Sequence, residues 1–201
     1  EPEPERKSDS LKTLLSSPLF RCFTVMMVCA GASEIAMAEW ASMFAQQALG
    51  VSKVVGDLAG PCAFAIFMGT GRILYARFSA KLSFRKTVIV LSALCAACYL
   101  TTALTGIPIL ALVSCAVCGF TVSVMWPGTY SAGAKAFPRG DAVMFSVFAM
   151  CGDLGCCLGP WILGIIADIK SLHTGFAVTA LFPIIMLITA IFFFKEKVIK
   201  E

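Results

Sequence analysis

Long apolar segments separated by short polar stretches dominate the chain. They lie at about residues 20–46, 54–79, 87–105, 107–136, 142–169 and 175–194. Each segment is close to, or longer than, the roughly 20 residues that a helix needs to cross the hydrocarbon core of a bilayer. Because backbone groups in lipid must be satisfied within the segment, this length predicts helices; the short alternating segments of a membrane barrel are absent from the sequence. We therefore predict an all-α membrane protein with six transmembrane helices.

The composition supports a membrane protein over a soluble one. Apolar residues make up 59% of the 201 residues and charged residues only 14%, whereas soluble domains are about 45–50% apolar and about 25% charged. A soluble fold of this size could not cover so much apolar surface with polar groups. Residues 1–18 are charged, contain proline and serine, and show no periodicity, which is typical of a cytoplasmic linker. Residues 19–195 would then form the helical bundle and residues 196–201 a cytoplasmic tail.

Lysine and arginine are distributed unequally between the two sides of the predicted bundle. If both termini are cytoplasmic, 14 of the 16 basic residues lie on the inner side, and only Lys53 and Lys170 lie on the outer side. This asymmetry follows the positive-inside rule, so we expect a multi-pass protein of the cytoplasmic membrane with both termini inside. The basic residues are not clustered on one polar element, so they do not indicate a nucleic-acid partner.

The first apolar segment contains two carboxylates. Ionisable residues inside a membrane are costly, so each is a candidate for contact with a solute or a proton. Glu34 and Glu39 are five residues apart, which is roughly 140° around a helix, so they cannot share one face. Glu39 is followed directly by Trp40. The alternative is that these carboxylates are buried groups that hold helices together.

A third carboxylate, Asp153, lies in the fifth segment beside Gly152, Gly155 and Gly159. Glycines at spacings of three and four predict the close approach of another helix. Because no lysine or arginine lies in the core of the same segment, we expect the partner of Asp153 to come from another helix, water or substrate.

The fourth segment carries a polar and aromatic patch. Trp126 and Tyr130 share a helix face through their spacing of four, and such rings with polar tips suit sugar-like solutes. They could equally belong to an interfacial aromatic belt. The fourth and fifth segments also contain Pro127 and Pro160, so these long helices must tilt or kink. The predicted solute-binding residues are Glu34, Glu39, Trp40, Trp126, Tyr130 and Asp153.

All ten cysteines lie inside apolar segments. The pairs Cys95/Cys98 and Cys115/Cys118 have neither the helix N-terminus nor the nearby base that a redox pair needs, so we favour packing over redox chemistry. The single histidine, His173, lies in an outer loop, which argues against a metal site. The sequence also lacks a phosphate-binding glycine-rich loop. We expect no cofactor, no metal and no enzymatic activity.

Three stretches resemble a known family. The segment between the second and third helices, Gly71–Lys86, is similar to the Gly/Asp/Arg loop signature of the major facilitator superfamily, with Ala80 in place of the Asp and Ser83 in place of a Gly. The stretches Met125–Ser131 and Gly152–Asp168 resemble the tenth and eleventh helices of fucose/hexose-permease-type members. The resemblance assigns a cytoplasmic gating loop to Gly71, Arg72, Arg77, Lys81, Arg85 and Lys86.

The resemblance covers essentially residues 19–195 and implies a 3+3 inverted-repeat half of a twelve-helix transporter. It implies secondary active transport of a small solute, with sugars as candidates, together with H+ or Na+. The partners would be the lipid bilayer and either the N-terminal six-helix half or a second copy of this chain. Two alternatives stay open: a stand-alone six-helix scaffold or assembly protein, and a membrane thiol-redox relay.

Overall fold

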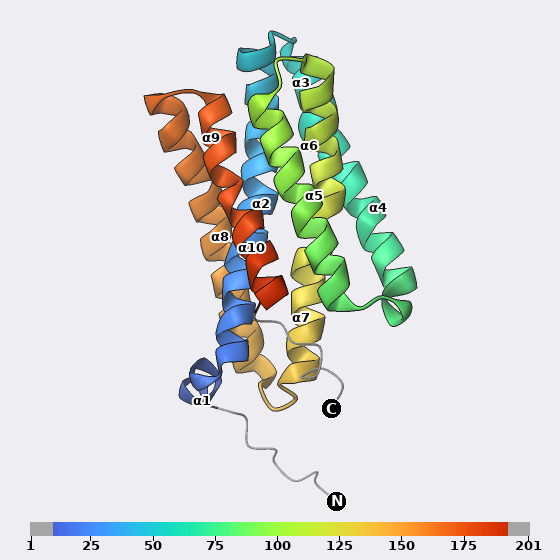
Figure 1. The fold of residues 1–201 in the computed structure, drawn as a ribbon, viewed down its shortest axis with the longest axis vertical. Helices are drawn as coiled ribbons and strands as arrows, with labels where there is room; N and C mark the ends of the chain where they lie inside the picture. Colours follow the sequence, from blue (N-terminus) through green and yellow to red (C-terminus); the bar gives the residue numbers. More distant parts are fainter. Residues whose placement is uncertain (1–9, 193–201) are drawn as a thin grey trace, which may run out of the picture.

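The computed structural model describes residues 10–192, and the predicted linker up to residue 9 and the tail from residue 193 lie outside this range. Every regular element in this range is helical, which confirms the predicted all-α fold class (Figure 1). The elements are α1 (Leu11–Ser16), α2 (Pro18–Leu49), α3 (Lys53–Asp57), the π-helical turn η1 (Leu58–Cys62), α4 (Ala63–Phe78), the 3-10 turn η2 (Ser79–Lys81), α5 (Phe84–Leu104), α6 (Pro108–Val122), α7 (Met125–Ala136), α8 (Asp141–Ile169), α9 (Leu172–Thr179) and α10 (Leu181–Phe192).

Six helical stretches among the described residues are long and apolar enough to cross a membrane. They are Pro18–Gln47, Lys53–Lys81, Phe84–Leu104, Pro108–Ala136, Ala142–Ile169 and Leu172–Phe192. Their mean hydropathy lies between 1.4 and 2.3, and large apolar side chains such as Ile66 and Ile73 are exposed on them. Apolar residues on the outside of the bundle are what a lipid environment requires, because lipid tails are as apolar as the core.

Serine caps explain where two of these stretches begin. The Ser17 hydroxyl accepts a hydrogen bond from the Phe20 N–H, directly before α2, and the Ser171 hydroxyl accepts one from the Thr174 N–H, directly before α9. An N-cap serine satisfies one of the free N–H groups of the first turn. The sixth stretch therefore begins at Leu172, three residues before the predicted start. The short helix α1 lies within the predicted linker, where the sequence showed no helical periodicity.

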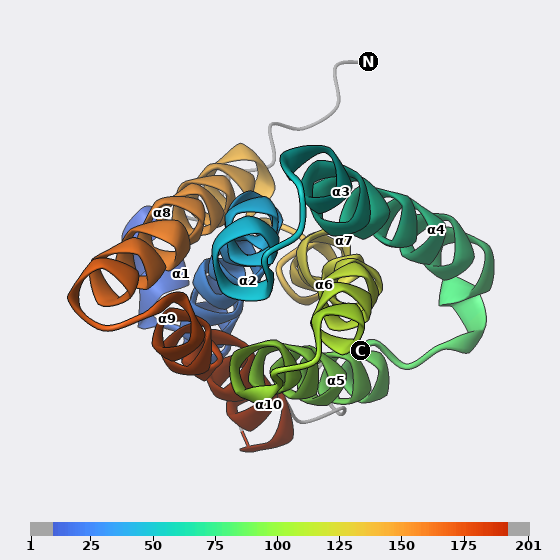
Figure 2. The same ribbon diagram turned by 90° about the horizontal axis from the view of Figure 1, so that it is seen from above.

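Helix α2 lies at the centre of the bundle and packs most extensively against α8 (Figure 2). Close approach is possible because glycines of α8 face the backbone of α2. A Cβ on Gly159 would lie 2.5 Å from the carbonyl oxygen of Ala32, and a Cβ on Gly155 would overlap the carbonyl group of Val28. This contact confirms that the glycines of the fifth segment serve helix packing.

The fourth membrane-length stretch, for which the sequence predicts a tilt or kink, is interrupted just before Pro127. Pro127 has no N–H, so the carbonyl group of Ser123 loses the donor that a continuous helix would supply four residues later. The Ser123 N–H itself bonds back only three residues, to the Phe120 carbonyl oxygen at 3.4 Å. The helix therefore ends as α6 and restarts as α7. In contrast, α8 runs through Pro160 as one element.

Candidate functional site

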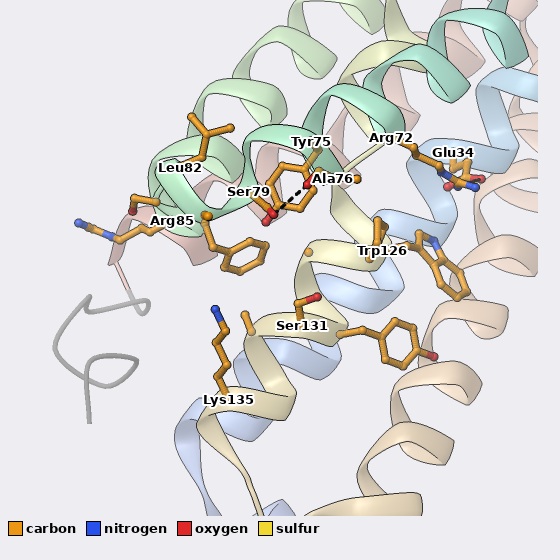
Figure 3. Close-up of a pocket in the computed structure, with 17 residues that line it drawn as sticks. Glu34, Arg72, Tyr75, Ala76, Ser79, Leu82, Arg85, Trp126, Ser131 and Lys135 are labelled. Atoms are coloured by element: carbon orange, nitrogen blue, oxygen red, sulfur yellow. Dashed lines mark hydrogen bonds and ion pairs between the residues drawn. The ribbon is translucent and has the colours of Figure 1, made fainter.

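A cavity with a volume of about 1050 Å³ lies between α2, α4, α5 and α7 (Figure 3). Within the described residues α4 packs along α6 but scarcely touches α7, so the break in the fourth stretch separates α7 from α4 (Figure 1). The cavity lies between α4 and α7, on the α7 side of the break. Its lining residues are Glu34, Arg72, Tyr75, Ala76, Ser79, Ala80, Leu82, Ser83, Phe84, Arg85, Trp126, Pro127, Gly128, Tyr130, Ser131, Ala132 and Lys135.

An ion pair between two membrane-spanning stretches lies in this cavity. The Arg72 guanidinium donates from Nη2 to Glu34 Oε1 at 3.4 Å, and the two side chains point toward each other in Figure 3. The Glu34 side chain is only 14% exposed, whereas that of Arg72 is 46% exposed. Arg72 has no other partner among the described residues. One long hydrogen bond leaves most of the donors of the guanidinium available.

Two buried polar atoms of residues that line the cavity have no hydrogen-bond partner within the described residues. They are the second carboxylate oxygen of Glu34, Oε2, and the indole Nε1 of Trp126. A buried polar group without a partner costs about 1–3 kcal/mol, so each is a place where a ligand or water would be stabilised. Glu34, Arg72 and Trp126 all line this cavity (Figure 3).

Small residues place these polar groups. A Cβ on Gly71 would overlap the side chain of Ser123, so α4 meets the break of the fourth stretch at Gly71 and the next residue, Arg72, reaches the cavity. A Cβ on Gly152 would lie 2.5 Å from the Trp126 ring, so this ring packs on Gly152. The backbone next to Glu34 is linked to α5, because the carbonyl oxygen of Ser33 accepts a hydrogen bond of 2.7 Å from the buried Tyr99 hydroxyl.

Tyr130 extends the aromatic side of the cavity. Its ring centroid lies 6.3 Å from that of Trp126, and it stacks on Phe145 with a centroid distance of 5.6 Å. Both predicted aromatic residues of the fourth stretch therefore lie in the same cavity as Glu34.

The remaining predicted binding residues lie elsewhere. Glu39 and Trp40 line a second hollow of about 400 Å³, together with Met43, Pro160 and Trp161. The two glutamates of α2 thus face different hollows, as their angular separation requires. Asp153 is exposed, lines neither hollow and forms no ion pair within residues 10–192.

The residues assigned to the gating loop have three different locations. Gly71, Arg72 and Arg77 lie within α4 rather than in a loop, because this helix continues to Phe78. Lys81 lies in η2, and Arg85 and Lys86 lie in the first turn of α5.

The Arg85 side chain joins α5 to α10 through two hydrogen bonds. Its guanidinium donates to the carbonyl oxygen of Ala190 at 3.2 Å and to that of Ile191 at 2.8 Å, so it links the start of α5 to the last described turn of α10.

Sequence reasoning missed the role of Arg72 as the partner of Glu34. The signal that could have found it is its position inside an apolar segment, where an unpaired cation is costly. Tyr75 and Ser79 follow at spacings of three and four, so they share a helix face with Arg72, and both line the cavity.

Cys95 and Cys118, one from each Cys-x-x-Cys motif, contact each other across two helices. The buried sulfur atoms of Cys95 in α5 and Cys118 in α6 lie 3.7 Å apart. All ten cysteines are free thiols. Among the described residues, no three His, Cys, Asp or Glu side chains are arranged to hold a metal ion.

Comparison with known proteins agrees with the architecture. A model of the Major Facilitator Superfamily matches residues 23–201, which include all six membrane-length stretches apart from the first turn of α2. No curated protein matches the chain. Six apolar helices with an ion pair between two of them, and a family match over most of the chain, lead to one conclusion: the chain belongs to the major facilitator superfamily of membrane transporters.

Proposed function

We propose that this chain is the C-terminal half of a secondary transporter, which carries a small solute across the cytoplasmic membrane by alternating access. The observation that supports this proposal most is the Glu34–Arg72 ion pair in a cavity of about 1050 Å³. Charged groups inside a membrane are costly and usually mark a solute or ion pathway. The volume is that of a pocket for a small molecule.

In this proposal α2, α4, α5 and α7 form one wall of the solute pathway. The opposite wall comes from an N-terminal six-helix half or from a second copy of the chain, and the two walls rock around the bound solute. Both termini face the cytoplasm, in agreement with the distribution of lysine and arginine. The loop from η2 to the start of α5 would act as a gate on that side.

The proposed solute is sugar-like, in keeping with the resemblance to fucose/hexose-permease-type members. Trp126 and Tyr130 offer aromatic faces, and the free atoms Glu34 Oε2 and Trp126 Nε1 offer one acceptor and one donor. Transport would be driven as symport by a gradient of H+ or Na+, with Glu34 as the candidate coupling group. Glu39 and Trp40 would contact the solute at the second hollow, and Asp153 from α8.

Side-specific thiol labelling tests alternating access without knowledge of the solute. Trp126→Cys would be made in the intact protein after replacement of the exposed Cys62 and Cys157 by serine. A charged, membrane-impermeant methanethiosulfonate is then added to either side of sealed vesicles. We expect labelling from both sides, because the cavity would open to each side in turn.

A matched control is Val90→Cys, on the exposed apolar surface of α5. A charged reagent is not expected to reach this position through lipid from either side. Labelling of Trp126→Cys from neither side, or from one side only, would contradict alternating access and favour the scaffold alternative.

A further inference from the structure

The residues that line the cavity between α2, α4, α5 and α7 carry more positive than negative charges. Three cations, Arg72, Arg85 and Lys135, face a single carboxylate, Glu34, so the formal charge of the lining is +2. Glu34 is already paired with Arg72. The Arg85 guanidinium bonds to neutral carbonyl oxygens of α10, and Lys135 is exposed without a partner within the described residues. Neither of these two charges is neutralised by a carboxylate of the described chain.

Among the unused hydrogen-bonding groups of the cavity, donors outnumber acceptors. The Trp126 indole can only donate, and the guanidinium of Arg72 can only donate. Both have unused N–H groups here. The one unused acceptor among the buried atoms of the lining is Glu34 Oε2. A matching ligand therefore presents acceptor oxygens toward Trp126 and Arg72 and at least one hydroxyl donor toward Glu34.

Basic residues near one end of the bundle are expected in any membrane protein, so Lys135 and Arg85 alone would not indicate a ligand. Arg72 differs from them because it lies nine residues before the end of its span at Lys81. Trp126, on a different helix, lines the same cavity, and its unpartnered Nε1 is a second observation, without a charge, that indicates a missing acceptor (Figure 3).

We propose that the cavity binds a hydroxylated monocarboxylate, such as a sugar acid, in preference to a neutral sugar. This inference rests on the proposed transport function and names its substrate class. The carboxylate accepts hydrogen bonds from Arg72 and Trp126, and Lys135 adds to the positive potential. A hydroxyl group donates to Glu34 Oε2, and the carbon skeleton lies against the Trp126 ring. Hydrogen bonds between ionised groups are roughly twice as strong as neutral ones, so the carboxylate supplies the preference.

Equilibrium binding of matched probes to the purified intact protein tests this proposal. D-gluconate and D-sorbitol differ only in whether the first carbon is a carboxylate or a hydroxymethyl group. D-galacturonate and D-galactose give the same comparison in ring form. We expect at least one acid to bind with a Kd lower than that of its neutral counterpart by about tenfold or more.

Two arginines of α4 provide the variant and its control. Arg72→Gln should remove the preference for the acid, whereas Arg77→Gln should retain it, because Arg77 does not line the cavity. Since Arg72→Gln leaves Glu34 without its partner, the double variant Glu34→Gln/Arg72→Gln is measured as well, and it should also lack the preference. Lys135→Gln, which leaves the ion pair intact, should weaken binding of the acid by about threefold and that of the neutral sugar hardly at all.

Equal affinity for acid and neutral sugar would overturn the proposal, and so would tighter binding of the neutral sugar or binding of neither acid. An unchanged acid preference in both Arg72→Gln and the double variant would overturn it too. Labelling of Trp126→Cys from both sides of the membrane, combined with any of these results, would leave the transport proposal standing and refute only the substrate class.

Discussion

The contact between α2 and α8 permits a quantitative prediction for Gly159→Ala. The added Cβ would lie 2.5 Å from the carbonyl oxygen and 2.8 Å from the Cα of Ala32, where ordinary contact begins at 3.4 Å. Both atoms belong to the backbone of α2, so no side-chain rotation can relieve the overlap. The two helices must separate by up to 0.9 Å at this point. Their interface is the most extensive in the described bundle, and helix association in lipid depends on close packing.

The expected cost is about 1–3 kcal/mol, the range for an extra methyl group in a closely packed interior. For a chain of this length, 1 kcal/mol lowers the melting temperature by about 2–4 °C. A cost of about 2 kcal/mol therefore predicts a decrease of roughly 4–8 °C. The melting temperature can be followed in detergent with a thiol-reactive fluorogenic dye, because buried thiols such as Cys95 and Cys118 react only after unfolding.

Gly69→Ala is the matched control. It makes the same chemical change in α4, where the added Cβ meets nothing within 4 Å. Any gain in helix propensity, up to about 1 kcal/mol, is present in both variants and cancels in their comparison. If Gly159→Ala melted at the same temperature as Gly69→Ala, the α2–α8 contact would not be the close backbone contact described above.

Three further predictions concern the site and its surroundings. In Gly152→Ala the added Cβ would lie 2.5 Å from the Trp126 ring, so the ring should shift toward the cavity. We expect a shifted tryptophan emission maximum and weaker gluconate binding, and an unchanged spectrum and Kd would contradict this. Arg85→Gln should accelerate amide exchange in the last described turn of α10, whose carbonyl groups lose their charged donor, whereas Lys86→Gln should not. Equal exchange in both variants would show that the Arg85 contact does not stabilise this turn. Iodine should oxidise Cys95 and Cys118 to a disulfide, since their sulfur atoms lie 3.7 Å apart; counting the remaining thiols with a maleimide–polyethylene glycol reagent after denaturation should show two fewer than in untreated protein, and a loss that persists in Cys118→Ser would contradict this pairing.

The fold class could be predicted from the sequence because hydropathy and length act locally. An apolar segment of about 20 residues or more has few alternatives to a membrane-spanning helix. The different surroundings of Glu34 and Glu39 were predictable for the same reason, because the angle between two residues of one helix depends only on their spacing. The break near Pro127 followed from the missing N–H of a single residue.

The Glu34–Arg72 pair could not be predicted in this way. The two residues are 38 positions apart on different helices, so their contact depends on the rotation and tilt of α2 and α4. Those quantities are set by packing, and the sequence pattern alone places Arg72 with the basic residues of the following loop. For Asp153 the sequence predicts the packing of the neighbouring glycines against α2. It does not predict where the Asp153 side chain itself points.

The polar groups of the cavity depend on small residues that carry no charge. The break caused by Pro127 separates α7 from α4, Gly71 lets α4 approach that break, and Gly152 leaves room for the Trp126 ring. Each of these positions fixes backbone or ring placement, which a longer side chain cannot do without shifting a helix. Enlarging Gly71 or Gly152 should therefore alter solute binding as strongly as removing a charge. The specificity of this site would then be set jointly by the charges of Glu34 and Arg72 and by the residues that hold them in place.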